Sequence, residues 1–276
     1  MIFFSRKGSD RVPRTVTIKP EEAEFPITYQ LSAMQGIGKR SEQQDSFASL
    51  NDNDVVKSKR EGLFAVVADG MGGLASGKQV SELVIDCMLH AFAQIDLQGD
   101  LFEQLKAAAV SANERTFQQF NSRGGSTLIA CLLYGEKLWY VSVGDSALFL
   151  LRNGTLSRIN EEHNSLTDDY HHLVSGGDMD PYGARSNPER AALSRYMGMY
   201  DLDEVDGFRR PLPLESGDTI LICSDGISSF LSEGQLKQCL QGGSPRDICS
   251  QLEEAIYWRS ARNQDNYTAI VIQCRS

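Results

Sequence analysis

Five aspartates stand where strand-like segments end or begin, and their placement has the clearest chemical meaning in the sequence. FAVVADGMGG carries Asp69 directly after an apolar run, and TILICSDG carries Asp225 in the same position. Asp145 closes the run YVSVGD, Asp265 precedes YTAIVI, and Asp45 follows ITYQLSAM by a few residues. Carboxylates gathered at one end of a sheet repel one another unless cations lie between them.

Sites built only from oxygen ligands bind hard cations such as Mg²⁺ or Mn²⁺ rather than zinc. Gly70 and Gly226 follow two of the aspartates, so the backbone can turn tightly and bring a carbonyl to a metal. Two ions about 3.5–4 Å apart can share a water, lower its pKa and clamp a phosphoryl group. A single Asp-Gly pair is more often a turn than a ligand pair, so spacing alone leaves both interpretations open.

The composition is that of a soluble globular protein with an acidic balance. The chain has 276 residues, 41% of them hydrophobic, and a formal net charge of −10 without any block of consecutive Lys or Arg. Nucleic acid is therefore not expected as a partner, because phosphate backbones require a basic surface. An acidic protein that binds phosphate needs a local arginine or a metal ion.

The cysteines and the apolar runs together indicate a reducing, cytoplasmic environment. No CxxC pair occurs, and several cysteines lie inside apolar runs, which predicts buried free thiols in a reducing environment. The six are Cys87, Cys131, Cys223, Cys239, Cys249 and Cys274. No run reaches the roughly 18 apolar residues of a membrane span, and the N-terminal apolar stretch is too short for a signal peptide. We expect a cytoplasmic protein with no membrane contact.

Segments typical of strands and helices predict an α+β fold. Apolar or alternating runs predict strands at 27–34, 63–68, 126–134, 138–144, 147–159, 219–224 and 267–274, with a hairpin at Asn153–Gly154. Amphipathic patterns predict helices at 76–94, 101–120 and 244–261. Strands in meander order with a few inserted helices favour antiparallel sheets covered by helices.

The chain reads as a single domain over residues 26–276, preceded at 1–25 by an arm or an extra edge strand. Residues 165–192 are the longest irregular stretch, with three glycines and two prolines. Such a segment is either a loop near the functional site or a loop without a role in the chemistry.

Eight segments, five of which carry these aspartates, resemble those of the metal-dependent Ser/Thr protein phosphatases of type 2C, the PPM family, particularly its bacterial branch. They occur in the family's order and span residues from about 30 to 274. The segments are RSEQQD (40–45), VVADGMGG (66–73), GGSTL (124–128), VSVGDS (141–146), NEEHNSL (160–166), LSRYMG (193–198), LICSDGI (221–227) and DNYTAIV (265–271).

The resemblance implies a β-sandwich of two antiparallel sheets flanked by pairs of antiparallel helices, with two Mn²⁺ or Mg²⁺ ions at one end. By position, Asp69 would bridge both metals and the carbonyl of Gly70 would bind one of them. Asp225 and Asp265 would complete the shell of the second metal, and Asp45 would hold the first through water.

The resemblance also assigns Asp145 to a third, weaker metal site, and it assigns Arg40, together with Asp69, to catalysis. Arg40 would grip the substrate phosphate, a role that suits the forked guanidinium. An arginine taken alone is more often part of a surface salt bridge. Residues 165–192 would be the flap beside the active site.

Four positions depart from the family's motifs. Gln43 stands where asparagine is usual, and Gln44 stands where Glu, Gln or Asp is usual. Both keep polar side chains, which alters the outer metal shell rather than removing it. Met71 stands where eukaryotic members carry a histidine proposed as a general acid. Ala147 replaces the arginine of the motif GDSR, which puts a local salt bridge in question but not the metal site.

The histidines are not expected to take part in the chemistry. His163 lies in a segment that is packed and structural in the family. The adjacent His171 and His172 diverge on any regular element, so joint metal ligation is not expected, and we place them in an exposed loop.

The resemblance implies hydrolysis of phosphoserine and phosphothreonine in proteins by a metal-bridged hydroxide, in a monomer that opposes a Ser/Thr kinase. No Cys-x5-Arg or G-x-S-x-G motif offers a competing nucleophile. Two alternatives stay open. One is a catalytically silent family member that acts as a binding module, and the other is a hydrolase of small phosphorylated metabolites.

Overall fold

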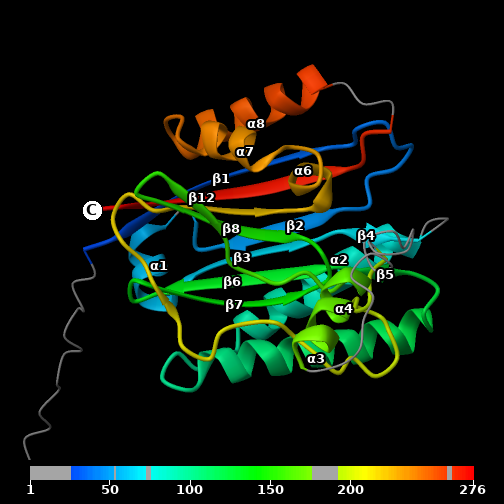
Figure 1. Ribbon diagram of the computed structural model, residues 1–276. Helices are drawn as coiled ribbons and strands as arrows, with labels where there is room; N and C mark the ends of the chain where they lie inside the picture. Colours follow the sequence, from blue (N-terminus) through cyan, green and yellow to red (C-terminus); the bar gives the residue numbers. More distant parts are fainter. Residues whose placement is uncertain (1–25, 53, 73–75, 176–191, 260–262) are drawn as a thin grey trace, which may run out of the picture.

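Two five-stranded antiparallel sheets stack face to face in the computed structural model, which describes residues 26–52, 54–72, 76–175, 192–259 and 263–276 (Figure 1). The first sheet has the order β1 (Thr28–Gly36), β12 (Tyr267–Arg275), β11 (Thr219–Cys223), β8 (Ala147–Arg152) and β9 (Thr155–Arg158). The second has the order β10 (Leu212–Pro213), β7 (Lys137–Val143), β6 (Leu128–Tyr134), β3 (Leu63–Ala68) and β2 (Ser46–Leu50). A small third sheet pairs β4 (Gly70–Met71) with β5 (Gly125–Ser126).

Helices cover the outer face of each sheet (Figure 1). α2 (Ser76–Phe92) and α3 (Leu101–Phe120) pack on the second sheet, and α7 (Glu233–Leu240) and α8 (Pro245–Arg259) pack on the first. The remaining helices are α1 (Val55–Glu61), α4 (Ser165–Val174) and the single turn α6 (Asp225–Ser228). The predicted β-sandwich flanked by helix pairs is confirmed.

Both faces of the central strands are buried, which explains why they read as continuous apolar runs. Along β6, Ala130 and Leu132 pack against the helices, whereas Ile129 and Cys131 face the other sheet. Successive side chains of a strand point to opposite faces, so a strand between two cores needs apolar residues at every position. Five of the six cysteines are buried free thiols, as expected, and Cys87 is partly exposed.

The sheet register brings the aspartate-bearing loops to one end of the sandwich. Ser46 at the start of β2 pairs with Ala68 at the end of β3. Cys223 at the end of β11 pairs in the same way with Ala269 near the start of β12. Because neighbouring strands run antiparallel, the loop after one strand lies beside the loop before its partner.

The first part of the segment expected to be irregular is a helix. Within 165–192, the first ten residues form α4, and residues 176–191 lie outside the described residues. The side chain of Asn164 caps α4 by accepting a hydrogen bond from the backbone N–H of Thr167. This cap, together with leucine, tyrosine and valine at helical spacing, favours a helix over a loop. The arm expected at 1–25 also lies outside the described residues.

Short elements account for the other differences from the predicted pattern. The strand expected at 126–134 divides at Thr127 into β5 and β6, and β2, α1, β4, β10, α6 and α7 were not expected. α7 carries a capping box in which Ser232 and Gln235 satisfy each other's backbone N–H groups. The sequence contains this capping motif, but a helix of eight residues has too few turns to show a clear apolar periodicity.

Candidate metal centre

Asp69 and Asp225 lie at the ends of buried strands, where the backbone is closely packed. The backbone N–H of Asp69 donates to Thr127 Oγ1 over 2.9 Å, and Thr127 N–H donates to the Asp69 carbonyl over 2.9 Å. A Cβ atom at Gly70 would lie 2.4 Å from the carbonyl oxygen of Gln44, and one at Gly226 would lie 1.9 Å from that of Asn266. Only glycine fits at either position, because real Cβ atoms do not approach a backbone oxygen so closely.

Asp45 joins the two sheets and keeps one oxygen without a partner. Its Oδ2 accepts hydrogen bonds from Ser224 Oγ over 2.9 Å and Thr268 Oγ1 over 2.7 Å. Its Oδ1 is buried and has no hydrogen-bond partner. Burial raises the pKa of Asp45 to about 6. A buried carboxylate oxygen without a donor is costly for the protein alone and is suited to a cation or a cation-bound water.

Asp265 and Arg40 pair with each other at the same end of the molecule. Arg40 Nη2 lies 2.5 Å from Asp265 Oδ2, and the N–H of Asn266 donates to Asp265 Oδ1 over 2.8 Å. The Arg40 side chain is 58% exposed. The candidate phosphate-binding group is thus in direct contact with one of the candidate metal ligands.

The carboxylates act on one another electrostatically. Burial, followed by the charges of Asp45, Asp225 and Asp145, holds the pKa of Asp69 well above its usual range. Burial, and then the charge of Asp225, raises the pKa of Asp145 to about 7. The pKa of Asp225 is raised as well, chiefly by burial. Four predicted ligands therefore share one buried, electronegative region.

Within the described part of the chain, no three His, Cys, Asp or Glu side chains form a ready-made ligand set. The structure nevertheless brings the predicted aspartates to one region, where the carboxyl group of Asp69 interacts with those of Asp45 and Asp225. Buried like charges this close to one another are costly unless a proton or a cation offsets them. The all-oxygen donor set and the unpartnered Asp45 Oδ1 fit hard divalent cations such as Mn²⁺ or Mg²⁺.

Comparison with known proteins decides the family. The family model described as "Protein phosphatase 2C" matches residues 36–255. The chain belongs to the protein phosphatase 2C family. No helix in the described part of this type 2C protein is long and apolar enough to cross a membrane.

Curated relatives and solved structures agree with this assignment. The chain is 31% identical over 236 residues to the serine/threonine protein phosphatase PstP of Mycobacterium tuberculosis, covering 82% of this chain but 44% of PstP. It is 27% identical over 231 residues to the serine/threonine phosphatase stp of Listeria welshimeri, covering 79% and 87% of the two chains. The catalytic domain of PstP in complex with two manganese ions superposes with a TM-score of 0.70 at 27% identity, covering 91% of this chain and all of that one. The chain thus spans less than half of PstP.

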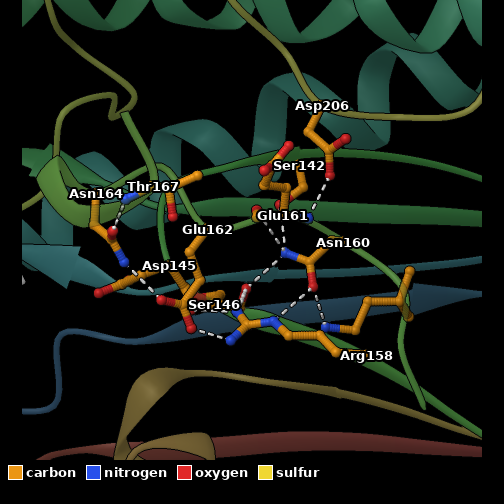
Figure 2. Close-up of polar contacts among 11 residues, drawn as sticks. Ser142, Asp145, Ser146, Arg158, Asn160, Glu161, Glu162, Asn164, Thr167 and Asp206 are labelled. Carbon is orange, nitrogen blue, oxygen red and sulfur yellow. Dashed lines mark hydrogen bonds and ion pairs between the residues drawn. The ribbon is translucent and has the colours of Figure 1, made fainter. Parts of the chain in front are cut away.

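Arg158 supplies a guanidinium at the turn where the type 2C motif GDSR has become GDSA (Figure 2). It donates to the carbonyl oxygen of Asp145 over 3.0 Å and to that of Ser146 over 3.1 Å, and it forms an ion pair with Glu162. An ion pair is therefore present at this turn, and its arginine comes from β9.

The same network connects the Asp145 turn to the start of α4 (Figure 2). Asn160 Nδ2 donates to the carbonyl of Ser146 over 2.9 Å and to Ser142 Oγ over 3.0 Å. Glu162 Oε2 accepts a hydrogen bond from Asn164, the residue that caps α4, over 2.6 Å. Hydrogen bonds and an ion pair therefore link the Asp145 turn to the N-cap of α4, the first element of the predicted flap.

Replacing Arg158 by alanine is expected to lower the free energy of unfolding by about 1–3 kcal/mol, because two carbonyls and Glu162 lose their donor. Urea unfolding at pH 7 measures the change. Arg209→Ala is the matched control, since Arg209 is 83% exposed and pairs only with Glu103 among the described residues. Equal losses in the two variants would contradict the role of Arg158.

His163, His171 and His172 have structural contacts, whereas Gln43 contacts the backbone of a predicted ligand. His163 is buried, its Nδ1 accepts from the Gly144 N–H over 3.2 Å, and burial lowers its pKa, so it is a neutral packing residue, as expected. His171 and His172 lie on α4 and not in a loop, and His171 contacts Glu161. Gln43 Oε1 accepts from the Asp45 N–H over 3.2 Å.

Sequence reasoning missed the residues that hold the site together. Ser224 and Thr268 fix Asp45, and Asn266 links two loops by accepting from the Gln44 N–H over 2.9 Å. Their signal was available, because each lies one to three residues from a predicted ligand. Small polar residues beside strand ends are so common, however, that position alone does not distinguish them.

Proposed function

We propose that this chain is a Mn²⁺- or Mg²⁺-dependent phosphatase that hydrolyses phosphoserine and phosphothreonine esters in proteins. The observation that carries the proposal is the buried group of carboxylates at one end of the sandwich, in which Asp45 Oδ1 has no donor. Membership of the type 2C family and the two manganese ions described for the PstP catalytic domain support it.

Two divalent cations bound here would supply an activated water and offset the charge of the phosphoryl oxygens. The residues proposed to hold them are Asp69, the carbonyl of Gly70, Asp225 and Asp265, with Asp45 acting through water and Asp145 at a third, weaker site. Ser224 and Thr268 keep the carboxylate of Asp45 in one orientation. The uncatalysed hydrolysis of phosphate monoesters is among the slowest reactions known, so charge and in-line geometry must supply most of the acceleration.

Arg40 is proposed to bind the substrate phosphate. Its guanidinium already lies at the acidic region, where Asp265 holds it at 2.5 Å. Its forked guanidinium, which here pairs with a carboxylate, has the geometry to bind two phosphate oxygens in the same way.

Replacing Arg40 by alanine is expected to lower kcat/KM for an aryl phosphate about 10- to 100-fold, mainly through KM, because one charge-assisted pair to the phosphate is lost. Steady-state kinetics in saturating Mn²⁺ measure this change. Arg60→Ala is the control, since Arg60 is equally cationic and 74% exposed on α1. An unchanged KM for Arg40→Ala would remove Arg40 from the substrate site.

We further propose phosphorylated proteins as the substrates, an opposing Ser/Thr kinase as the functional partner, a monomer, and a cytoplasmic location. The names of the curated relatives support the substrate class, and the buried free thiols support a reducing compartment. The decisive experiment compares kcat/KM for a phosphothreonine peptide with kcat/KM for free phosphorylated metabolites. A preference for the metabolites would replace the protein phosphatase by a small-molecule hydrolase.

A further inference from the structure

A groove of about 740 Å³ beside the candidate metal centre takes no part in the proposed chemistry. Ile37 and Lys39 from the loop after β1 line one part of it, together with Gln264 from the loop before β12. Tyr257 and Trp258 near the end of α8 line the facing part. Its volume lies within the range of about 300–1,000 Å³ that is typical of ligand sites.

The groove is lined by the chain neighbours of the proposed phosphate site, since Lys39 precedes Arg40 and Gln264 precedes Asp265. The backbone N–H of Lys39 donates to the Gln264 carbonyl over 2.8 Å, and Asn266 Nδ2 donates to the Ile37 carbonyl over 2.9 Å. These bonds join the loop that carries Arg40 to the loop that carries Asp265. We therefore expect a chain that leaves the phosphate position on this side to reach the groove within a few residues, since each extended residue spans about 3.3 Å.

The wall formed by α8 presents two aromatic side chains to solvent. Tyr257 is 75% exposed and Trp258 is 74% exposed. Their rings meet edge to face at 5.7 Å, and Trp258 Nε1 donates to Glu254 Oε1 over 3.2 Å. Held in this way, the rings offer a large apolar surface with little loss of freedom on binding, the property that makes Trp and Tyr common anchors in interfaces.

The groove has a positive charge at the end near Arg40 and a negative charge at the α8 side. The ammonium of Lys39 forms no ion pair with any residue that the structure describes, and Lys39 directly precedes Arg40 in the chain. Glu253 lines the α8 side. The end near the phosphate site therefore favours an acidic side chain, whereas the α8 end favours an apolar one and disfavours a second acid.

We propose that this groove binds the polypeptide that flanks the phosphorylated residue of a protein substrate. An acidic side chain next to that residue would pair with Lys39, and an apolar side chain further along would pack on Tyr257 and Trp258. The proposal rests on the proposed phosphatase function. It adds a preference for certain residues that flank the phosphorylated residue, recognised by the groove beside α8.

The kinetic test uses a phosphothreonine peptide with aspartate next to the phosphoresidue and leucine further out on both sides. Trp258→Ala is expected to lower kcat/KM for this peptide about tenfold and to leave kcat/KM for p-nitrophenyl phosphate unchanged, because that substrate has no flanking chain. Val56→Ala is the control, since Val56 is also 74% exposed but lies on α1. Equal effects on the two substrates, or no effect on the peptide, would overturn the proposal.

Trp258 also gives a readout that does not need turnover, because Trp139 is the only other tryptophan in the chain. In Asp69→Asn/Trp139→Phe protein, the peptide is expected to shift the Trp258 emission saturably, at least about fivefold more tightly than a glycine-flanked phosphothreonine peptide. Equal affinity for both peptides would overturn the proposal. A shift that follows protein concentration without peptide would assign the groove to a second copy of the chain.

The two measurements distinguish a failure of the phosphatase function from a failure of the groove proposal. Wild-type protein that fails to hydrolyse p-nitrophenyl phosphate would count against the phosphatase, whereas the emission titration still reports whether the flanking chain occupies the groove. Lys39→Met should abolish the preference for aspartate over asparagine next to the phosphoresidue while keeping the preference for leucine.

Discussion

Replacing Asp69 by asparagine is expected to lower the turnover of an aryl phosphate by about a thousandfold or more in saturating Mn²⁺, while the protein stays folded. Asparagine keeps the size of the side chain and removes the charge that would bridge two cations. Asp69 is central to the buried region, since the charges of Asp45, Asp225 and Asp145 all act on it. The measurement is the initial rate of p-nitrophenyl phosphate hydrolysis.

The same variant should unfold at an equal or higher temperature than the wild type in chelator. The pKa of Asp69 lies well above its usual range, so its charged form destabilises the fold near neutral pH, and the neutral asparagine removes that repulsion. Asp247→Asn is the control, because Asp247 lies at the surface and bonds to Ser244. An Asp69→Asn variant that keeps a tenth or more of the wild-type rate would exclude Asp69 as a metal bridge.

Mn²⁺ is expected to stabilise the protein by about 4 kcal/mol at pH 8 when present at a thousand times its Kd, and by much less at pH 5. Metal ligands must lose their protons, and burial raises the pKa of Asp45 to about 6 and that of Asp145 to about 7. Protons therefore compete with the cation below neutral pH.

Without metal, the stability of the protein is expected to change with pH in the opposite direction. A carboxyl group whose pKa is raised on folding contributes stability that is fully present below its unfolded pKa and is lost as the pH rises through its folded pKa. The unfolding temperature in chelator should therefore fall between pH 5 and pH 8, and the curve in Mn²⁺ should diverge from it. Asp145→Asn should flatten the fall around pH 7. Parallel curves with and without Mn²⁺ would contradict a metal site built from these acids.

The sequence predicted the parts of the fold in which local pattern and packing agree. β3 and α3 have their expected bounds, because a strand buried on both faces must be apolar throughout and a long helix repeats its apolar face over several turns. Asp69 and Asp225 were recognisable because each interrupts such a run and is followed by a glycine, and the packing around Gly70 and Gly226 admits no larger residue.

What the sequence did not predict depends on contacts between distant segments. Arg158 lies 13 residues after Asp145 and reaches its carbonyl only because β8 and β9 form a hairpin. Arg158 therefore supplies a guanidinium at the turn where Ala147 replaces the arginine of the motif. The partner of Arg40 was equally hidden, since Asp265 is separated from it by 225 residues. Pairings of this kind follow from sheet register, which a local pattern does not specify.

The central claim is that metal ions held by these aspartates make the chain a protein phosphatase. The most direct test is the release of inorganic phosphate from a phosphothreonine peptide by chelator-treated wild-type protein, before and after Mn²⁺ is added. We expect no release before the addition and sustained turnover after it. Release that persists in chelator, or no release from folded protein whose unfolding temperature rises with Mn²⁺, would contradict the claim.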